Sequence, residues 1–306
     1  MRYVRDHVSV RVPATAGNLG PGFDALGMAL GVVDEVEVWA LGSTAVEIAI
    51  EGVGADSLPR DDSHLMVRAM RAAADAVGLP HTGVRIVARN SIPHGRGLGS
   101  SAAAVVAGIA AVRGLIDEPE ALSDEVMLRI ATEFEGHPDN AAPAILGGAT
   151  AAWVDVDGAH AVTLTLAEGL ETAVLIPTAV LATDEARAVL PATVPHRDAA
   201  FNVGRAALLV AALAHAPERL FAATEDRLHQ TYRAPVMTSA AAMMGHLRDQ
   251  GLAAVVSGAG PSVLVIGRNL AAAGLVEGEL EWANGIGEDT WRCVHTVGPV
   301  PGVLAT

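Results

Sequence analysis

The residues best suited to chemistry in this sequence form a glycine-rich loop, Ile92–Ser101, with the sequence IPHGRGLGSS. The loop runs into the small apolar segment Ala102–Val106, which is typical of a helix. Glycine lets the chain turn so that unpaired N–H groups at the start of a helix point outward, where the helix dipole adds positive charge. This pattern predicts a phosphate site, in which a serine hydroxyl caps the helix or binds Mg²⁺. The alternative is a glycine turn that only precedes a buried helix.

The basic residues narrow the class of phosphate site. Lysine and arginine together number 20, and every one of them is arginine. A Walker A loop and a protein kinase each need a lysine at the phosphates, and pyridoxal phosphate needs a Schiff-base lysine. All three are therefore excluded. A bound nucleotide must be held by main-chain amides, hydroxyls, a metal ion and arginine.

A second cluster of functional side chains, EFEGHPDN, occupies Glu133–Asn140. Acidic side chains at the C-terminal end of a helix oppose the helix dipole, and a bound cation would compensate them. We expect Glu133 to be the second Mg²⁺ ligand, with Glu135 as the alternative. A single glutamate would ordinarily belong to a solvated helix face, but the density of Glu, His, Asp and Asn favours a site.

The segment Pro13–Asp24, with the sequence PATAGNLGPGFD, predicts a fixed, irregular loop after the first strand. Loops of this kind on rigid scaffolds often hold ligands. Asp24 could pair with an ammonium group, and Asn18 could bond a hydroxyl. The alternative for either residue is an Asx turn that serves only the loop itself.

Two arginines lie in polar segments of the second half, Arg187 in TDEAR and Arg233 in HQTYR. Each guanidinium can grip a carboxylate with two hydrogen bonds, and two of them could hold one carboxylate or a transferring phosphoryl group. Taken singly, each is an ordinary surface arginine. A second glycine turn, Ser257–Val265 (SGAGPSVLV), either bends a hairpin or helps to close an active site.

Alternating strands and helices must position these segments. Hydrophobic periodicity predicts strands at 7–12, 34–40, 45–50, 83–88, 148–155, 161–166, 172–176, 253–257, 262–266 and 290–296, with the second and third paired around Gly42. Helices are predicted at 63–78, from the glycine loop to 113, at 123–134, from 183, at 198–215 and at 271–279. This interleaving predicts two α+β domains, 1–165 and 166–306.

Composition limits the partners of the chain. The formal net charge is −15 and no basic block occurs, which argues against nucleic acid and anionic membranes. We predict no transmembrane helix and no signal segment. The single cysteine, Cys293, excludes an intramolecular disulfide. A cytoplasmic protein is the expectation.

Three motifs resemble those of the GHMP small-molecule kinases: PATAGNLGPGFD, IPHGRGLGSSAAA and SGAGPSVLV. Within that family, GNLGPGFD, EGHPDN, TDEAR and HQTYR are similar to the homoserine kinases. The resemblance extends over residues 8–266. It implies a two-domain α+β fold, with an N-terminal ATP-binding domain and a ferredoxin-like C-terminal domain, and an active site in the cleft between them.

The resemblance also implies roles for the nucleotide-binding residues. Ser63 and His64 would lie near the nucleotide base. Ser101 and Glu133 would hold Mg²⁺, although Ser100 is an alternative to Ser101. The ATP phosphates would be wrapped by Pro93, His94, Gly95, Arg96, Gly97, Leu98, Gly99, Ser100 and Ser101.

The implied acceptor, L-homoserine, is a zwitterion with a terminal hydroxyl, which would receive the phosphoryl group of ATP in a step of threonine biosynthesis. Asp24 would bind the ammonium group, and Arg187 and Arg233 the carboxylate. The hydroxyl end would contact Asn18, His137 and Asn140, and Asn18, Arg187, Asn140 and His137 are the expected catalytic residues. Whether Asp139 acts as a base is an open question. The resemblance further implies a homodimer.

Two other readings differ from this one. A GHMP kinase for a different alcohol, such as shikimate, mevalonate or a sugar, would not need two arginines for a zwitterion. A catalytically silent relative that senses a small ligand would not need both candidate Mg²⁺ ligands. The presence of both ligands favours an enzyme.

Overall fold

The computed structural model describes all residues, 1–306, and contains two β-sheets. The larger sheet has the strand order β12-β1-β2-β4-β3, and the hairpin of β5 and β6 joins it through β2. Its strands are β1 (His7–Gly17), β2 (Leu26–Leu41), β3 (Val46–Gly52), β4 (Gly83–Asn90), β5 (Ala149–Asp155), β6 (Gly158–Leu164) and β12 (Leu304–Ala305). Strand β12, at the end of the chain, pairs with β1 in this sheet.

The smaller sheet has the strand order β10-β11-β7-β9-β8. Its strands are β7 (Glu171–Pro177), β8 (Ala254–Val256), β9 (Val263–Gly267), β10 (Gly278–Glu279) and β11 (Trp291–Val297). The helices near this sheet are α5 (Thr183–Ala188), α6 (His196–Ala214), α7 (Leu220–Ala223), α8 (Gln230–Arg233) and α9 (Thr238–Asp249). A cluster of buried side chains packs between this sheet and α9.

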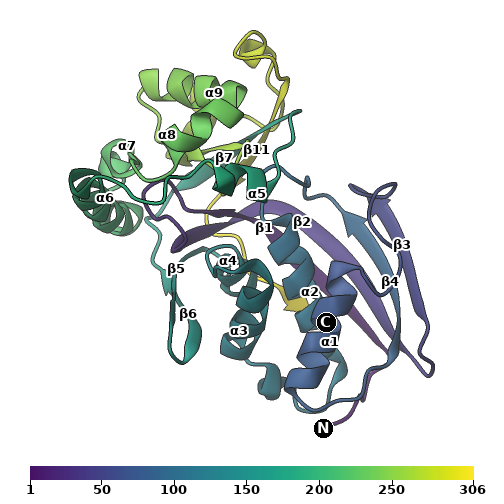
Figure 1. Ribbon diagram of the computed structural model, residues 1–306. Helices are drawn as coiled ribbons and strands as arrows, with labels where there is room; N and C mark the ends of the chain where they lie inside the picture. The colour runs from purple at the N-terminus through teal and green to yellow at the C-terminus, as the bar shows by residue number, and fades with distance from the viewer.

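Four helices lie together against one face of the larger sheet, as Figure 1 shows. They are α1 (Leu65–Ala76), α2 (Ser100–Leu115), α3 (Asp124–Glu135) and α4 (Ala141–Leu146). The central one, α2, consists largely of Ala, Val and Gly and is buried along most of its length. Small side chains allow this close packing: a Cβ at Gly108 would lie 2.6 Å from the carbonyl oxygen of Met66 on α1. This close packing holds α2 firmly against α1.

Most predicted elements are present, but α4, α7, α8, α9 and the terminal strand β12 were not predicted from the sequence. Three predicted features also differ from the structure. The strands on either side of Gly42 are not hydrogen-bonded to each other, because β4 lies between them and β3 pairs with β4 in parallel. The first helix is capped by His64 rather than Ser63. The prediction of a helix at 271–279 is wrong, because the structure has only a short 3₁₀ turn, Leu270–Ala273, which ends at the left-handed Gly274. No helix combines the length and apolar character needed to span a bilayer.

Candidate active site

The glycine-rich loop forms an anion-binding geometry at the start of α2. Gly95, Gly97 and Gly99 all have positive φ, near +65°, which other residues adopt only with strain. From Gly97 to Ala102, no main-chain N–H group has a hydrogen-bond partner within the protein. A Cβ at Gly99 would overlap Thr15 Oγ1, so only glycine fits there. These amides and the dipole of a 16-residue helix favour a phosphate group.

Contacts from distant segments hold this loop in place. Asp34 accepts hydrogen bonds from the main-chain N–H groups of Ser91 and Ile92, at 2.6 and 2.8 Å. Burial raises the pKa of Asp34, and the two hydrogen bonds oppose that rise. Arg96 donates to the carbonyl oxygens of Pro177 and Thr178, both at 2.8 Å, and so joins the loop to the smaller domain. Contacts within the protein therefore hold the backbone of the glycine-rich loop, which we call the phosphate loop, in place.

The second glycine turn packs directly against the phosphate loop. Ser257 Oγ donates to the carbonyl oxygen of Gly97 at 2.8 Å, and the Ser262 N–H donates to that of Arg96 at 3.3 Å. A Cβ at Gly97 would overlap the carbonyl oxygen of Ser257. The turn thus does more than bend a hairpin, because it supports one wall of the site.

Two cavities open on opposite sides of the start of α2, and both are lined by Ser100 and Ser101. The first, which we call the apolar cavity, has a volume of about 320 Å³. The second, the polar cavity, has a volume of about 250 Å³. The predicted site residues that line the polar cavity are Asn18, Asp24, Gly95, Gly97, Leu98, Gly99, Ser100, Ser101, His137, Asn140, Arg187 and Arg233.

The apolar cavity is lined by aliphatic side chains and a few polar ones. Ser63, His64 and His94 line it, together with aliphatic side chains of the sheet, α1 and α2. His64 is 5% exposed, and its Nδ1 accepts the main-chain N–H of Met66 at 3.3 Å. Because Nδ1 is the acceptor, Nε2 carries the proton in the neutral ring. Burial lowers the pKa of His64, which favours that neutral form.

The carboxylate beside Ser101 belongs to Glu135. Ser101 Oγ donates to Glu135 Oε1 at 2.5 Å, and Glu135 lines the polar cavity. Glu133, the first choice, is exposed and lines neither cavity, whereas the structure places the alternative, Glu135, beside Ser101. Burial raises the pKa of Glu135, and the hydrogen bond from Ser101 only partly offsets this. A hydroxyl and a desolvated carboxylate are oxygen donors of the kind that Mg²⁺ prefers, so these two residues fit that ion.

The two predicted arginines both reach the polar cavity. Arg187 forms a forked ion pair with Asp24, with distances of 2.7 and 3.3 Å. Arg233 is 1% exposed, so it is not an ordinary surface residue. Its guanidinium donates to the carbonyl oxygens of Ala186 and Gly258 at 3.1 and 3.2 Å. Burial lowers the pKa of Arg233, and the nearby positive charge of Arg187 adds to the effect.

One buried histidine supports Arg233, and the sequence analysis did not assign it a role. His229 Nε2 donates to the carbonyl oxygen of Gly20 at 2.8 Å, while Nδ1 accepts from Arg233 Nη1 at 3.1 Å. Burial lowers the pKa of His229. The ring is therefore held neutral in one tautomer. The signal was available in the motif HQTYR, where a histidine precedes the arginine by one helical turn.

The two asparagines at the site are largely engaged by the protein. Asn18 Nδ2 donates to the carbonyl oxygen of Gly258 at 2.8 Å, and its Oδ1 accepts the N–H of Asp24 at 2.9 Å. Asn140 Oδ1 accepts from Thr15 Oγ1 at 3.0 Å. Both still line the polar cavity, but the side-chain oxygen of Asn18 serves the loop itself, through a contact that spans six residues and is not an Asx turn. Asn18 thereby fixes the main chain that presents Asp24.

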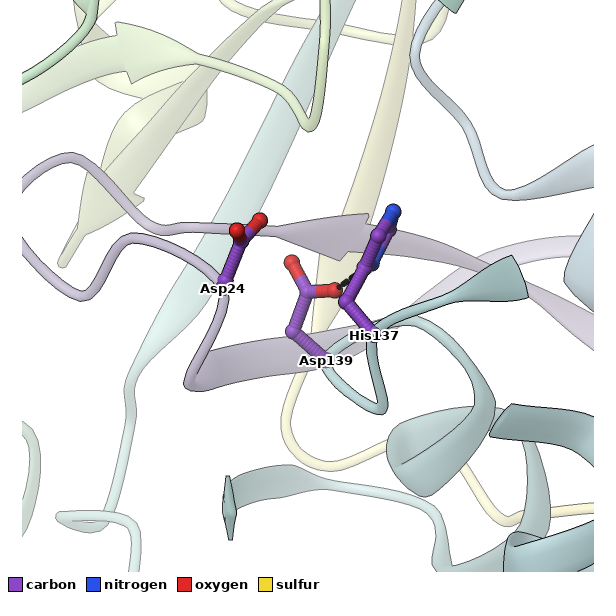
Figure 2. A group of neighbouring side chains, drawn as sticks. All are labelled: Asp24, His137 and Asp139. Carbon is purple, nitrogen blue, oxygen red and sulfur yellow. Dashed lines mark hydrogen bonds and ion pairs between the residues drawn. The ribbon is translucent and has the colours of Figure 1, made fainter. Parts of the chain in front are cut away.

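His137 and Asp139 form a hydrogen-bonded pair in the turn after α3. Asp139 Oδ1 contacts His137 Nδ1, and Asp139 Oδ2 accepts the N–H of Asn18 at 3.2 Å. Figure 2 shows Asp139 between Asp24 and His137 in this view, and one donor atom of each of the three lies within 4.8 Å of the others. Asp139 is 1% exposed and does not line the polar cavity, whereas His137 does. The interaction with Asp139 raises the pKa of His137, against the opposing effect of burial.

Comparison with known proteins identifies the family of the chain. Residues 64–148 match the GHMP kinases N terminal domain. A homoserine kinase of Leifsonia xyli is 49% identical over 281 residues, which cover 90% of this chain and 87% of the relative. A homoserine kinase of Streptomyces coelicolor is 51% identical over 260 residues, which cover 85% and 84%.

A solved structure supports the same fold. The crystal structure of homoserine kinase from Cytophaga hutchinsonii superposes with a TM-score of 0.85, at 24% identity, and covers 100% of this chain and 99% of that one. The two-domain GHMP kinase fold expected from the motifs is thus confirmed. By its sequence relatives and its fold, the chain is an enzyme of the GHMP kinase family and belongs there to the homoserine kinases.

Proposed function

We propose that this enzyme transfers the terminal phosphoryl group of ATP to the side-chain hydroxyl of L-homoserine, giving O-phospho-L-homoserine and ADP in threonine biosynthesis. One observation carries the proposal: the apolar cavity and the polar cavity meet at Ser100 and Ser101, beside a row of free main-chain amides. A nucleotide base on one side and a polar acceptor on the other would therefore bring their reacting groups together at the start of α2.

The nucleotide site combines three kinds of contact. The apolar cavity would enclose the adenine ring near Ser63 and His64. The N–H groups from Gly97 to Ala102 would bind the phosphates in place of a lysine. Ser101 and Glu135 would hold Mg²⁺, which when bound supplies positive charge against the phosphate oxygens.

The acceptor site offers a complement for each part of homoserine. Asp24 carries the charge that suits an ammonium group, and Arg187 and Arg233 carry those that suit a carboxylate. His137 and Asn140 lie at the end of the polar cavity formed by the turn after α3, and would face the hydroxyl. The engaged amide of Asn18 contributes by fixing Asp24 rather than by binding the hydroxyl through its oxygen.

The chemistry is an in-line displacement at phosphorus. The hydroxyl oxygen of homoserine forms a bond to the γ-phosphorus, the bond from that phosphorus to the β,γ-bridging oxygen breaks, and the hydroxyl proton is released. The transition state is loose, so positioning and charge neutralisation supply most of the catalysis. Asp139 is buried, does not line the cavity and is bonded to His137, which supports a role in orienting His137 instead of direct contact with the acceptor.

A coupled assay of ADP release tests the proposal. Homoserine, shikimate, mevalonate and galactose are compared as acceptors with MgATP. We expect homoserine to have the highest kcat/KM by at least about a hundredfold, because the other three lack the zwitterion that the charged groups match. A preference for any other acceptor would refute the assignment, and the absence of ADP release with all four would favour a ligand sensor. We expect the enzyme to act as a cytoplasmic homodimer, as its family resemblance implies.

A further inference from the structure

An internal ion pair occupies the part of the polar cavity where the charged end of an acceptor would bind. Arg187 Nη2 lies 2.7 Å from Asp24 Oδ1, and Arg187 Nη1 lies 3.3 Å from Asp24 Oδ2. Both side chains line the polar cavity, and about a third of each is exposed, 36% for Arg187 and 33% for Asp24. The two groups that best suit the ends of a zwitterion are therefore bound to each other.

The two partners differ in how firmly they are held. Asp24 has φ +55°, a strained value for a residue with a side chain, and its N–H is bonded to Asn18 Oδ1. Asn18 is itself tied to Gly258 on the second glycine turn. Arg187 projects from the short helix α5 on a flexible stem, and Asp24 is the only hydrogen-bond partner of its guanidinium. Arg187 is therefore the partner that can move.

Arg233 supplies a second positive charge in the polar cavity, near Arg187. Arg233 lies in the same cavity, with its guanidinium fixed by Gly258, Ala186 and His229. Burial lowers the pKa of Arg233, and the nearby positive charge of Arg187 lowers it further. A carboxylate placed between the two guanidinium groups would relieve that repulsion, and it could form a forked pair with Arg187 in place of the one that Arg187 forms with Asp24.

We propose that a zwitterionic acceptor binds by ion-pair exchange: its ammonium group replaces Arg187 on Asp24, while its carboxylate replaces Asp24 on Arg187 and reaches Arg233. The inference rests on the proposed function and deepens it, because it makes the internal pair the device that selects the acceptor. A zwitterion leaves both protein charges paired. An alcohol with one charge must break the pair and leave one of its members without a partner, so it is rejected.

Ion-pair exchange predicts that two variants bind some ligands more tightly than the natural protein does. Asp24→Asn frees Arg187 from its internal partner, so a ligand that carries only a carboxylate should bind this variant more tightly than the natural protein. Arg187→Gln frees Asp24, so a ligand that carries only an ammonium group should gain in the same way. Homoserine should lose affinity for both variants.

The experiment measures dissociation constants by calorimetry for three ligands in the presence of Mg²⁺ and a non-hydrolysable ATP analogue. The ligands are L-homoserine, 4-hydroxybutyrate and 3-aminopropan-1-ol, which share the hydroxyl chain and differ in charge. For Asp24→Asn we expect homoserine to weaken about thirtyfold and 4-hydroxybutyrate to tighten about threefold to tenfold. For Arg187→Gln we expect 3-aminopropan-1-ol to tighten by a similar factor.

Controls separate exchange from damage to the fold and from failure of the proposed function. Asp124→Asn breaks an ion pair with Arg113 that lies outside the polar cavity, and it should change none of the three constants. Unchanged affinity for the ATP analogue shows that each variant is folded. If the natural protein does not prefer homoserine, the proposed function fails. If it prefers homoserine but 4-hydroxybutyrate binds Asp24→Asn no better, ion-pair exchange alone is overturned.

Discussion

Ser101 Oγ and Glu135 Oε1 lie 2.5 Å apart, although 34 positions separate the two residues in the chain. Ser101 is in the first turn of α2 and Glu135 is the last residue of α3. A carboxylate at the C-terminal end of one helix therefore meets the N-terminal end of another, where the dipole favours negative charge. This contact brings the phosphate loop and the acidic cluster of the sequence into one site.

The assignment of the metal ligand predicts different effects at the two glutamates. Glu135→Gln should reduce kcat/KM for ATP by at least about a hundredfold and raise the Mg²⁺ concentration needed for half-maximal rate, because a charged oxygen ligand is lost. Glu133→Gln is the matched control on the same helix, and it should stay within about twofold of the natural rate, since Glu133 is exposed. Steady-state rates over a Mg²⁺ titration distinguish the two. A larger loss in Glu133→Gln would return the ligand to that residue.

The phosphate loop depends on glycine at position 99 for two reasons, positive φ and lack of space. Gly99→Ala should lower kcat/KM for ATP by at least about a hundredfold, because its Cβ would overlap Thr15 Oγ1 and displace the start of α2. Gly78→Ala is the control, since Gly78 has nearly the same φ, +67° against +66°, but open space around it. That variant should cost about 1 kcal/mol of stability and leave activity unchanged. Equal activity in the two variants would contradict the role of the loop.

The tautomer of His64 predicts how the base is bound. With Nδ1 occupied by the Met66 N–H, Nε2–H is left to donate to a ring nitrogen of adenine. His64→Ala should raise KM for ATP about tenfold, and His64→Asn, which can both cap α1 and donate, should recover most of the loss. Deaza analogues of ATP, each lacking one ring nitrogen, identify the acceptor. One analogue should bind as weakly to the natural enzyme as ATP does to His64→Ala. If all bind normally, His64 does not contact the base.

His229 predicts a pH dependence of stability. Burial lowers its pKa in the folded protein, whereas the unfolded chain binds a proton below about pH 6.5. The unfolded state therefore holds more protons as the pH falls through this region, and the free energy of unfolding should decrease. His229→Gln should be less stable at pH 7.5 by about 1–3 kcal/mol, because contacts with Gly20 and Arg233 are weakened. Its further loss between pH 7.5 and 5.5 should be smaller than that of the natural protein.

Urea unfolding at the two pH values checks this expectation. Exposed His215 provides the control, since His215→Gln should leave the pH dependence as it is in the natural protein. An unchanged loss of stability in His229→Gln would show that His229 does not control it.

Local patterns predicted most elements of the fold but not how they pair. Alternation of apolar residues identified β1, β7 and β11, because the period is a property of a single strand. The insertion of β4 between β2 and β3 depends on contacts between segments far apart in sequence, which no local period records. The same reason explains why the short terminal strand β12 was missed. The error at 271–279 arose from Gly274, whose left-handed conformation ends the turn.

Site residues could be predicted from the sequence where the residue type alone sets their role. They could not be predicted where the role depends on the direction in which a side chain points. Successive glycines predicted the phosphate loop because only glycine tolerates its backbone. Glu133 and Glu135 are chemically the same, but two positions on a helix differ in direction by about 200°, so only one can face α2. The ion pair of Asp24 with Arg187 could not be predicted, since the sequence placed each residue at the site separately and their mutual contact depends on the tertiary fold.

A crystal structure with Mg²⁺, a non-hydrolysable ATP analogue and L-homoserine tests the central claim most directly. The account predicts that phosphate oxygens accept hydrogen bonds from the main-chain N–H groups between Gly97 and Ala102, with homoserine in the polar cavity and its hydroxyl directed at the γ-phosphate. Phosphates bound away from these amides, or homoserine bound outside the cavity of Asp24 and Arg187, would contradict it.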